Sequence, residues 1–373
     1  MADPNSRLFS LSCLLLALLH CLTVSLAQTL FVFGDGYYDA GNKQFLSGNR
    51  VDANSPPYGI TVGEATGRWS DGRIVPDYLA GFMGIPKTPP ILRSSEDFSR
   101  GANFAIADAT VLGSSLETMT LFQQVMKFSQ NKNKWTGEAL SEAIYLTFIG
   151  SDDYLNYAKN NPNPSDDQKQ AFVGQVITSI EAAIKVIHEA GGRKFAFQNL
   201  APLGCLPVVK QEKGNEKECV NLPSELAALH NKNLLLLLEK LAQDLESFQY
   251  SFYDFFSSVQ DRVFEPTTYT FGTGTAACCG TGSVNGTGCA ADNVCAKPEE
   301  YVFFDGKHLT QEANFQVAHL MWNAYPRVIG PNNLHELLLL PLDSCHWIKA
   351  EQDQSFYNVK RLDQVGEASS FVI

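Results

Sequence analysis

The chain has 373 residues, of which 45% are hydrophobic and 18% charged, and its formal net charge is -12 at pH 7. These fractions are typical of a globular protein with one substantial core or two small ones. The acidic balance argues against nucleic-acid binding and against docking on anionic lipid, because both need clustered Lys and Arg.

The first segment of the chain has the pattern of a targeting signal. Arg7 precedes an apolar run that ends with Ser25 and Ala27, small residues at the spacing of a cleavage site. We therefore expect residues 1–27 to be a signal peptide that sends the chain into the secretory pathway. An uncleaved membrane anchor is the alternative. No later segment approaches the length of a membrane span, so we expect no integral span once the signal is removed.

The strand immediately after this signal ends in an unusual turn. The stretch FVFGDGYYDAGN, residues 31–42, combines a buried strand with a glycine-rich turn, where many α/β hydrolases present a nucleophile. The centre of the turn is Gly36, which has no side chain. Asp35 and Asp39 could suggest a cation site, but too few oxygen ligands cluster there, so we interpret them as capping and turn residues.

Apolar strand-like runs then alternate with helical patterns. The runs are TLFVFGD, IYLTFIG, KFAFQNL and SFYDFF, in chain order. A capping box of Ser165 and Gln168 begins one helix, Gly191 stops it, and a second helix starts at about Pro223. This alternation predicts an α/β fold with a mostly parallel sheet covered on both faces.

Ligands bind beyond the carboxyl ends of the strands in such sheets. FGDG and FIGSDD both follow strand ends, which places Gly36 near Asp152. Gly150, Ser151, Asp152 and Asp153 occupy a natural position for donors that stabilise an oxyanion, although paired acids are also used in glycoside hydrolysis.

Two further stretches carry candidate chemistry. In FSRGANFAIADAT, Gly101 could point a backbone N–H into a cleft, and Asn103 offers an amide. In FFDGKHLT, Asp305 precedes His308 by three residues, a spacing that lets a carboxylate orient an imidazole as a general base. Taken alone, an Asp-x-x-His match is weak and the histidine could equally be structural.

Cysteine use fits secretion. Nine cysteines are present, and Cys13 and Cys21 leave with the signal peptide, so an odd number remains and at least one is free or bonded to another chain. A Cys205–Cys219 disulfide and a pairing within the 278–295 cluster are plausible. Zinc is the alternative for that cluster, but its adjacent cysteines are poorly spaced for a zinc site.

Asn285 begins the sequon Asn-Gly-Thr. We expect it to be glycosylated and its loop to lie on the surface.

Taken together, these stretches resemble the plant GDSL esterase/lipase family of the SGNH hydrolase superfamily. The blocks FVFGDGYYDAGN, GRWSDGRIVPDYLA, RGANFAIADAT, IGSDDYLNY, NLAPLGCLP, ACCGTG and CAKPEEYVFFDGKHLTQEAN follow in the expected order over nearly the whole mature chain. DAGNKQ, MTLFQQVMKF, DDYLNYAKNNP and APLGCLPVVKQE look closest to the myrosinase-associated and epithiospecifier-modifier-like branch.

The resemblance implies a flavodoxin-like, three-layer α/β/α sandwich in one domain, which we place at residues 28–345, followed by a polar tail at 346–373. It implies a catalytic Asp305–His308 pair. It also implies an oxyanion hole at three positions, occupied here by Gly36, Gly101 and Asp152. Two of these depart from the family, because Gly36 replaces the nucleophilic serine and Asp152 replaces an asparagine. No cofactor and no metal are implied.

These departures predict a family member without carboxylester hydrolase activity. Loss of the nucleophile costs on the order of 10⁶ in turnover, and an ionised Asp152 would repel the oxyanion unless it stays protonated. Such a protein would bind partners, such as myrosinase or other endomembrane proteins, or an acyl-ester small molecule. Its compartment would be extracellular, vacuolar or ER-derived. The alternative is an active lipase or esterase that uses an unconventional nucleophile or a water activated by His308.

Overall fold

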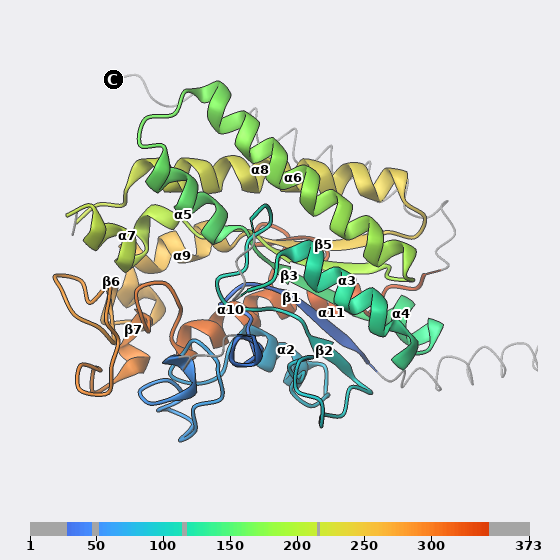
Figure 1. The fold of residues 1–373 in the computed structure, drawn as a ribbon, viewed down its shortest axis with the longest axis horizontal. Coiled ribbons are helices and arrows are strands. Elements are labelled where there is room, and N and C mark those ends of the chain that lie inside the picture. Colours follow the sequence, from blue (N-terminus) through green and yellow to red (C-terminus); the bar gives the residue numbers. More distant parts are fainter. Residues whose placement is uncertain (1–27, 47–51, 114–117, 215–216, 343–373) are drawn as a thin grey trace, which may run out of the picture. The chain divides into compact units, whose positions relative to one another are not determined.

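Six strands form a central sheet in the order β2-β1-β3-β4-β5-β8 (Figure 1). This computed structural model describes residues 28–46, 52–113, 118–214 and 217–342. The first five strands of that order are parallel, and β8 pairs antiparallel with β5. The order of the parallel strands is that of flavodoxin-like sheets, so the expected fold class is confirmed. The strands of this sheet are β1 (Leu30–Gly34), β2 (Gly101–Asn103), β3 (Ile144–Phe148), β4 (Lys194–Gln198), β5 (Gln249–Tyr253) and β8 (Ile329–Pro331).

The four apolar runs all form strands, and β1, β3 and β4 are buried along their whole length. One end was predicted wrongly. The run SFYDFF does not continue as a strand, because β5 stops at Tyr253 and the Asp254 side chain accepts a hydrogen bond from the Ser257 N–H. That cap begins α9 (Phe255–Phe264), so Phe255 and Phe256 are helical.

Helices cover both faces of the sheet. Along one face lie α3 (Leu121–Asn131), α6 (Asp166–Glu189) and α8 (Asn221–Asp244), with α6 in contact with the other two (Figure 1). On the other face α2 (Val75–Phe82) packs against α10 (Gln311–Asn323). The remaining α-helices among the described residues are α4 (Gly137–Glu142), α5 (Ser151–Asn160), α7 (Pro207–Glu212) and α11 (Leu334–Leu339).

Helix α6 confirms the predicted capping box, since Ser165 accepts from the Gln168 N–H and Gln168 bonds back to Ser165. One expectation about this helix needs correction. By length and composition α6 could cross a membrane. We had expected no segment after the signal peptide to approach the length of a membrane span. Its apolar stripe from Val173 to Ile187 is buried within the fold, and its outer face carries a Lys185–Glu181 ion pair at 2.8 Å. Those features are typical of a helix that covers a soluble core.

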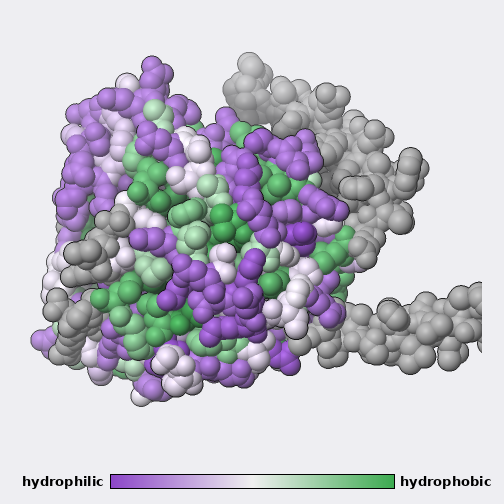
Figure 2. Space-filling view, turned by 45° about the vertical axis from the view of Figure 1, so that its right-hand side comes forward, coloured by the Kyte–Doolittle hydropathy of each residue, from purple (hydrophilic) through white to green (hydrophobic). Residues whose placement is uncertain are grey.

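The surface seen in Figure 2 is mostly hydrophilic, with smaller apolar patches between the polar side chains. The compact unit of the chain ends at Leu338, and a second unit begins at Leu339. The predicted signal peptide, Cys345 and the predicted tail lie outside the described residues.

A second, small sheet joins β6 (Thr273–Ala277) to β7 (Tyr301–Phe303). The described residues contain three disulfides: Cys205–Cys219, Cys278–Cys295 and Cys279–Cys289. The first was predicted, and the other two are pairings within the predicted cluster. They occupy all four cysteines of that cluster, so the zinc alternative is wrong. These disulfides are consistent with the secretory pathway.

Candidate active site

The turn after β1 is fixed by its own backbone. The Asp35 N–H donates to the carbonyl oxygen of Phe148 at 3.2 Å, which holds the turn beside the end of β3. At Gly34 a Cβ would lie 2.2 Å from that same carbonyl oxygen, so only glycine fits there. The buried carboxylate of Asp39 accepts the N–H groups of Gly41, Asn42, Lys43 and Ala107. Asp39 is therefore the turn residue that the sequence indicated.

Asp305 and His308 form the expected pair. The Nδ1 atom of His308 lies 3.0 and 2.9 Å from the two carboxylate oxygens of Asp305. The N–H groups of Lys307 and His308 donate to Oδ1 of the same carboxylate, at 2.8 and 2.7 Å. Burial alone would raise the pKa of Asp305, but the charge of His308 and these hydrogen bonds lower it below its usual value. Asp305 is therefore held as a carboxylate that orients the imidazole.

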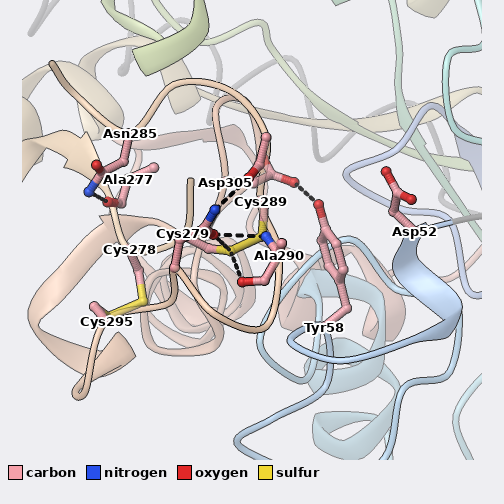
Figure 3. The surroundings of a disulfide bond; sticks show 12 residues. Asp52, Tyr58, Ala277, Cys278, Cys279, Asn285, Cys289, Ala290, Cys295 and Asp305 are labelled. Atoms are coloured by element: carbon pink, nitrogen blue, oxygen red, sulfur yellow. Dashed lines mark hydrogen bonds between the residues drawn. A yellow bond between two sulfur atoms is a disulfide. The ribbon is translucent and has the colours of Figure 1, made fainter. Parts of the chain in front are cut away.

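Tyr58 completes the support of this carboxylate, and sequence reasoning missed it. Its hydroxyl donates to Oδ2 of Asp305 at 2.9 Å, as Figure 3 shows. Trp69 and Tyr37 flank the His308 ring, with ring centroids 5.4 and 5.3 Å away. No spacing pattern in the sequence links Tyr58 to a residue so far along the chain.

The Nε2 side of His308 lies directly against Gly36. A Cβ built on Gly36 would be 2.5 Å from Nε2, far closer than an ordinary contact. The imidazole therefore occupies the space that a serine side chain would need. The same packing leaves no room for a water molecule between Gly36 and the nitrogen that would have to activate it.

Tyr37 does not supply a substitute nucleophile. Its hydroxyl donates to the carbonyl oxygen of Lys307 at 2.5 Å. Burial, followed by the charges of Asp35 and Asp305, raises the pKa of Tyr37 well above its usual value, so the phenol stays protonated. The hydroxyl of the neighbouring Tyr38 points elsewhere and donates to Gln198. Tyr37 contacts His308.

Asp152 is neutralised by a partner that the sequence analysis overlooked. Its Oδ1 lies 2.5 Å from Nζ of Lys307, and the two side chains are 16% and 32% exposed. Burial would lower the pKa of Lys307, but the charge of Asp152 and the hydrogen bond to it raise that pKa. The chain thus accommodates Asp152 through an ion pair with Lys307. Lys307 directly precedes His308, so it lies in the same stretch, FFDGKHLT, in which the sequence analysis found the histidine.

Asp35 lies beside that ion pair in a buried position. Neither its Oδ2 nor the hydroxyl of Ser151, both buried, makes a hydrogen bond of ordinary geometry among the described residues. Burial, and next the charge of Asp152, raise the pKa of Asp35 well above its usual value. Burial and the neighbouring charge therefore both disfavour the ionised form of Asp35.

Gly101 was assigned to the oxyanion hole wrongly. It pairs with Leu30 at the start of β1, whereas the site forms beyond the other end of that strand. Its N–H donates to Phe98 O at 3.0 Å. Position 101 opens its own short strand, so the residues that reach the site follow that strand. One of them is Ala107, whose N–H donates to Asp39. Asn103 binds the carbonyl oxygen of Tyr38, a structural contact.

The disulfide-bonded loop is attached to the strand that leads into Asp305. The N–H groups of Cys278 and Cys279 donate to the carbonyl oxygens of Phe303 and Phe304, at 2.9 and 2.7 Å. The sequon residue Asn285 is half-buried in this loop, and its amide donates to Ala277 O at 2.9 Å (Figure 3). Glycosylation of Asn285 stays a prediction, and it requires the amide to leave Ala277. Among the described residues, no group of three or more His, Cys, Asp and Glu could hold a metal.

Comparisons with known proteins agree on one family. The family model described as GDSL-like lipase/acylhydrolase matches residues 30–321. Inactive GDSL esterase/lipase-like protein 25 of Arabidopsis thaliana is 67% identical, over 100% of this chain and 94% of its own. GDSL esterase/lipase ESM1 of the same plant is 42% identical, over 84% and 83%. A solved GDSL-like lipase of Parabacteroides merdae is 11% identical, with a TM-score of 0.37 over 78% of this chain and 93% of its own. That last likeness is too distant to add an argument.

Proposed function

Because the chain belongs to the GDSL-like lipase/acylhydrolase family, we propose that it is a member without ester-hydrolase activity that acts as a ligand-binding or interaction protein. One observation carries the proposal: the His308 imidazole packs where the side chain of residue 36 would begin, 2.5 Å from the position of a Cβ. The name of the 67% identical relative also supports it.

The chemistry follows from what is present and what is missing. Asp305 and His308 retain the geometry of a general base, with the carboxylate on Nδ1 and Nε2 turned toward position 36. A base accelerates acyl transfer only by taking a proton from a nucleophile within reach. At Gly36 there is none, and removal of the nucleophile from such a triad costs on the order of 10⁶ in turnover.

The rival function is hydrolysis by a water that His308 activates. The intact Asp305–His308 pair favours it, and the Lys307 ion pair removes the repulsion that Asp152 would cause. The contact between Nε2 and Gly36 opposes it, because the water would have to displace the imidazole. This rival predicts turnover that depends on His308 and survives treatment with a serine-directed probe.

A fluorophosphonate probe tests the proposal at the level of the nucleophile. We expect no covalent adduct on the mature wild-type chain by intact mass spectrometry, while an active family member of similar size is labelled under the same conditions. Stoichiometric labelling of a single serine would show that the chain uses a nucleophile elsewhere, and the proposal would be wrong.

The biological setting that we propose is the secretory pathway, in the extracellular space, the vacuole or an ER-derived compartment. The likeness of DAGNKQ and DDYLNYAKNNP to the myrosinase-associated branch supports a role beside myrosinase in glucosinolate breakdown. Affinity capture from source tissue with the full mature chain tests this. Co-purification of a myrosinase would support it, and capture of unrelated cytosolic proteins alone would not.

A further inference from the structure

A cavity of about 430 Å³ lies beside the degenerate site, and neither Gly36 nor His308 lines it. It is bounded by α5, α7 and the first turn of α8. Its walls are mainly apolar, from Leu155, Val208, Val209, Val220, Leu222 and Pro223. This volume is within the range of small-molecule sites.

Covalent and backbone bonds hold these walls in place. The Cys205–Cys219 disulfide directly precedes Val220, whose N–H donates to Gly204 O at 2.9 Å. The Val208 N–H donates to Gly306 O at 2.9 Å, which ties α7 to the loop that carries Lys307. A cavity formed before the ligand arrives loses little free energy to ordering on binding.

The polar end of the cavity is the Lys307–Asp152 ion pair, since both residues line it. Three exposed side chains, Lys159, Glu212 and Lys213, line it as well. Lysines outnumber acids among these five side chains, in a chain whose formal net charge is -12. This local excess of positive charge favours an anionic ligand over a cationic one.

We propose that the cavity binds a small amphiphile, with its apolar body against the walls and an anionic head, carboxylate or sulfate, bonded to the Lys307 ammonium. An ammonium has three N–H groups, so it can bond the head while it still faces Asp152. This inference names the class of ligand for the proposed function, and it rests on the proposal that the chain is a ligand-binding protein. Neither His308 nor Gly36 takes part, and no covalent step is involved.

Isothermal titration calorimetry with ten-carbon probes below their micelle concentrations tests this. We expect decanoate and decyl sulfate to bind the mature chain and decyltrimethylammonium not to bind. The two anionic probes also distinguish the head groups, because only one of them binds if the cavity is specific for carboxylate or for sulfate. Preferential binding of the cationic probe would overturn the proposal.

Variants locate the binding. Lys307→Gln should weaken anion binding about tenfold or more, the loss expected for one charge-assisted hydrogen bond. Asp152→Asn should strengthen it, because the ammonium no longer shares its charge with a carboxylate. Val208→Phe should block binding by filling the cavity. Lys185→Gln is the matched control, because it also breaks an ion pair but lies on α6, away from the cavity walls. It should leave the affinity for the anionic probes unchanged.

Weaker binding by Asp152→Asn, or equal binding by Val208→Phe, would show that the anion does not bind here. Thermal denaturation of each variant shows whether it is folded before its affinity is compared. If no probe binds the folded wild-type chain, this inference fails while the lack of hydrolysis stands. If hydrolysis of an ester probe is found, the proposed function fails independently of these affinities.

Discussion

The Nε2 atom of His308 faces Gly36 so closely that a Cβ on residue 36 would be 2.5 Å away. The opposite nitrogen of the ring is held by Asp305, which also accepts the Tyr58 hydroxyl. The ring is thus fixed from one side and packed against bare backbone on the other. A pair of residues typical of catalysis serves here to pack the turn after β1 against the loop at 305–308.

This packing makes Gly36 a structural requirement. Gly36→Ala should lower the free energy of unfolding by about 1–3 kcal/mol, the usual cost of overfilling a packed site. Urea denaturation measures it. Gly174→Ala is the control, because a Cβ on that α6 residue meets nothing within 4 Å, and it should stabilise the fold by about 0.5–1 kcal/mol.

The cause of that loss can be isolated by removing the imidazole. In a His308→Ala background an added Cβ at position 36 has room, so Gly36→Ala should then cost much less than it does in the wild type. If the losses in free energy of unfolding are additive in this double-mutant cycle, the cost of Gly36→Ala does not come from a clash with His308.

Restoring the hydroxyl should not restore the enzyme. In Gly36→Ser combined with Asp152→Asn, the serine lies where the imidazole packs, and Lys307 loses its partner at 2.5 Å. We expect p-nitrophenyl butyrate turnover by the double variant to stay at least about 10²-fold below an active relative. Turnover approaching that relative would show that His308 withdraws easily and that the rest of the site is intact.

Tyr58→Phe tests the support of Asp305. It removes the donor to Oδ2 of a buried carboxylate, which leaves a polar atom without its bond, at a cost of about 1–3 kcal/mol. A lowered melting temperature is the expected result. Tyr325→Phe, at a residue that is 84% exposed, should melt like the wild type. Equal melting of the two variants would argue against a structural role of this hydrogen bond.

His230 should make the fold sensitive to acid. It is buried beside Tyr154, whose hydroxyl lies 2.8 Å from its Nδ1, and burial lowers the pKa of His230 from 6.5 to about 3. Because the folded pKa is depressed, stability is fully present above pH 6.5 and is lost as pH falls toward 3. Within that window the slope from this residue is about 1.4 kcal/mol per pH unit.

His230→Gln removes the titrating group and leaves a side chain that can bond Tyr154. Urea unfolding of both proteins at several values between pH 4 and 7 should show a flatter dependence for the variant. Other titrating groups are common to the two proteins and cancel in the difference. Identical slopes would place the acid sensitivity elsewhere.

The sequence predicted the sheet because its strands are short apolar runs buried on both faces, and the capping box at Ser165 marked the start of α6. It placed Gly36 near Asp152 because both follow strand ends, and the family resemblance added the Asp305–His308 pair to the same site. Gly101 was misplaced because it opens a three-residue strand. It therefore lies at the amino end of the parallel strands, whereas the site lies beyond their carboxyl ends.

The side-chain contacts that decide the function could not be predicted from sequence patterns. Tyr58, Trp69 and His308 meet only in the folded chain, where no local period relates them. That Lys307 neutralises Asp152 follows from the direction of two side chains, one in the first turn of α5 and one on the loop at 305–308. The missing hydroxyl at residue 36 was visible in the sequence. The closing of the space by His308 was not.

Ester hydrolysis by the mature chain is the most direct test of the account. Steady-state release of p-nitrophenol from p-nitrophenyl acetate and butyrate should be measured for the wild type, for His308→Ala and for an active family member. We predict a wild-type rate no higher than that of His308→Ala and many orders of magnitude below the active member. A rate comparable to the active member, abolished by His308→Ala, would contradict the claim that this imidazole only packs.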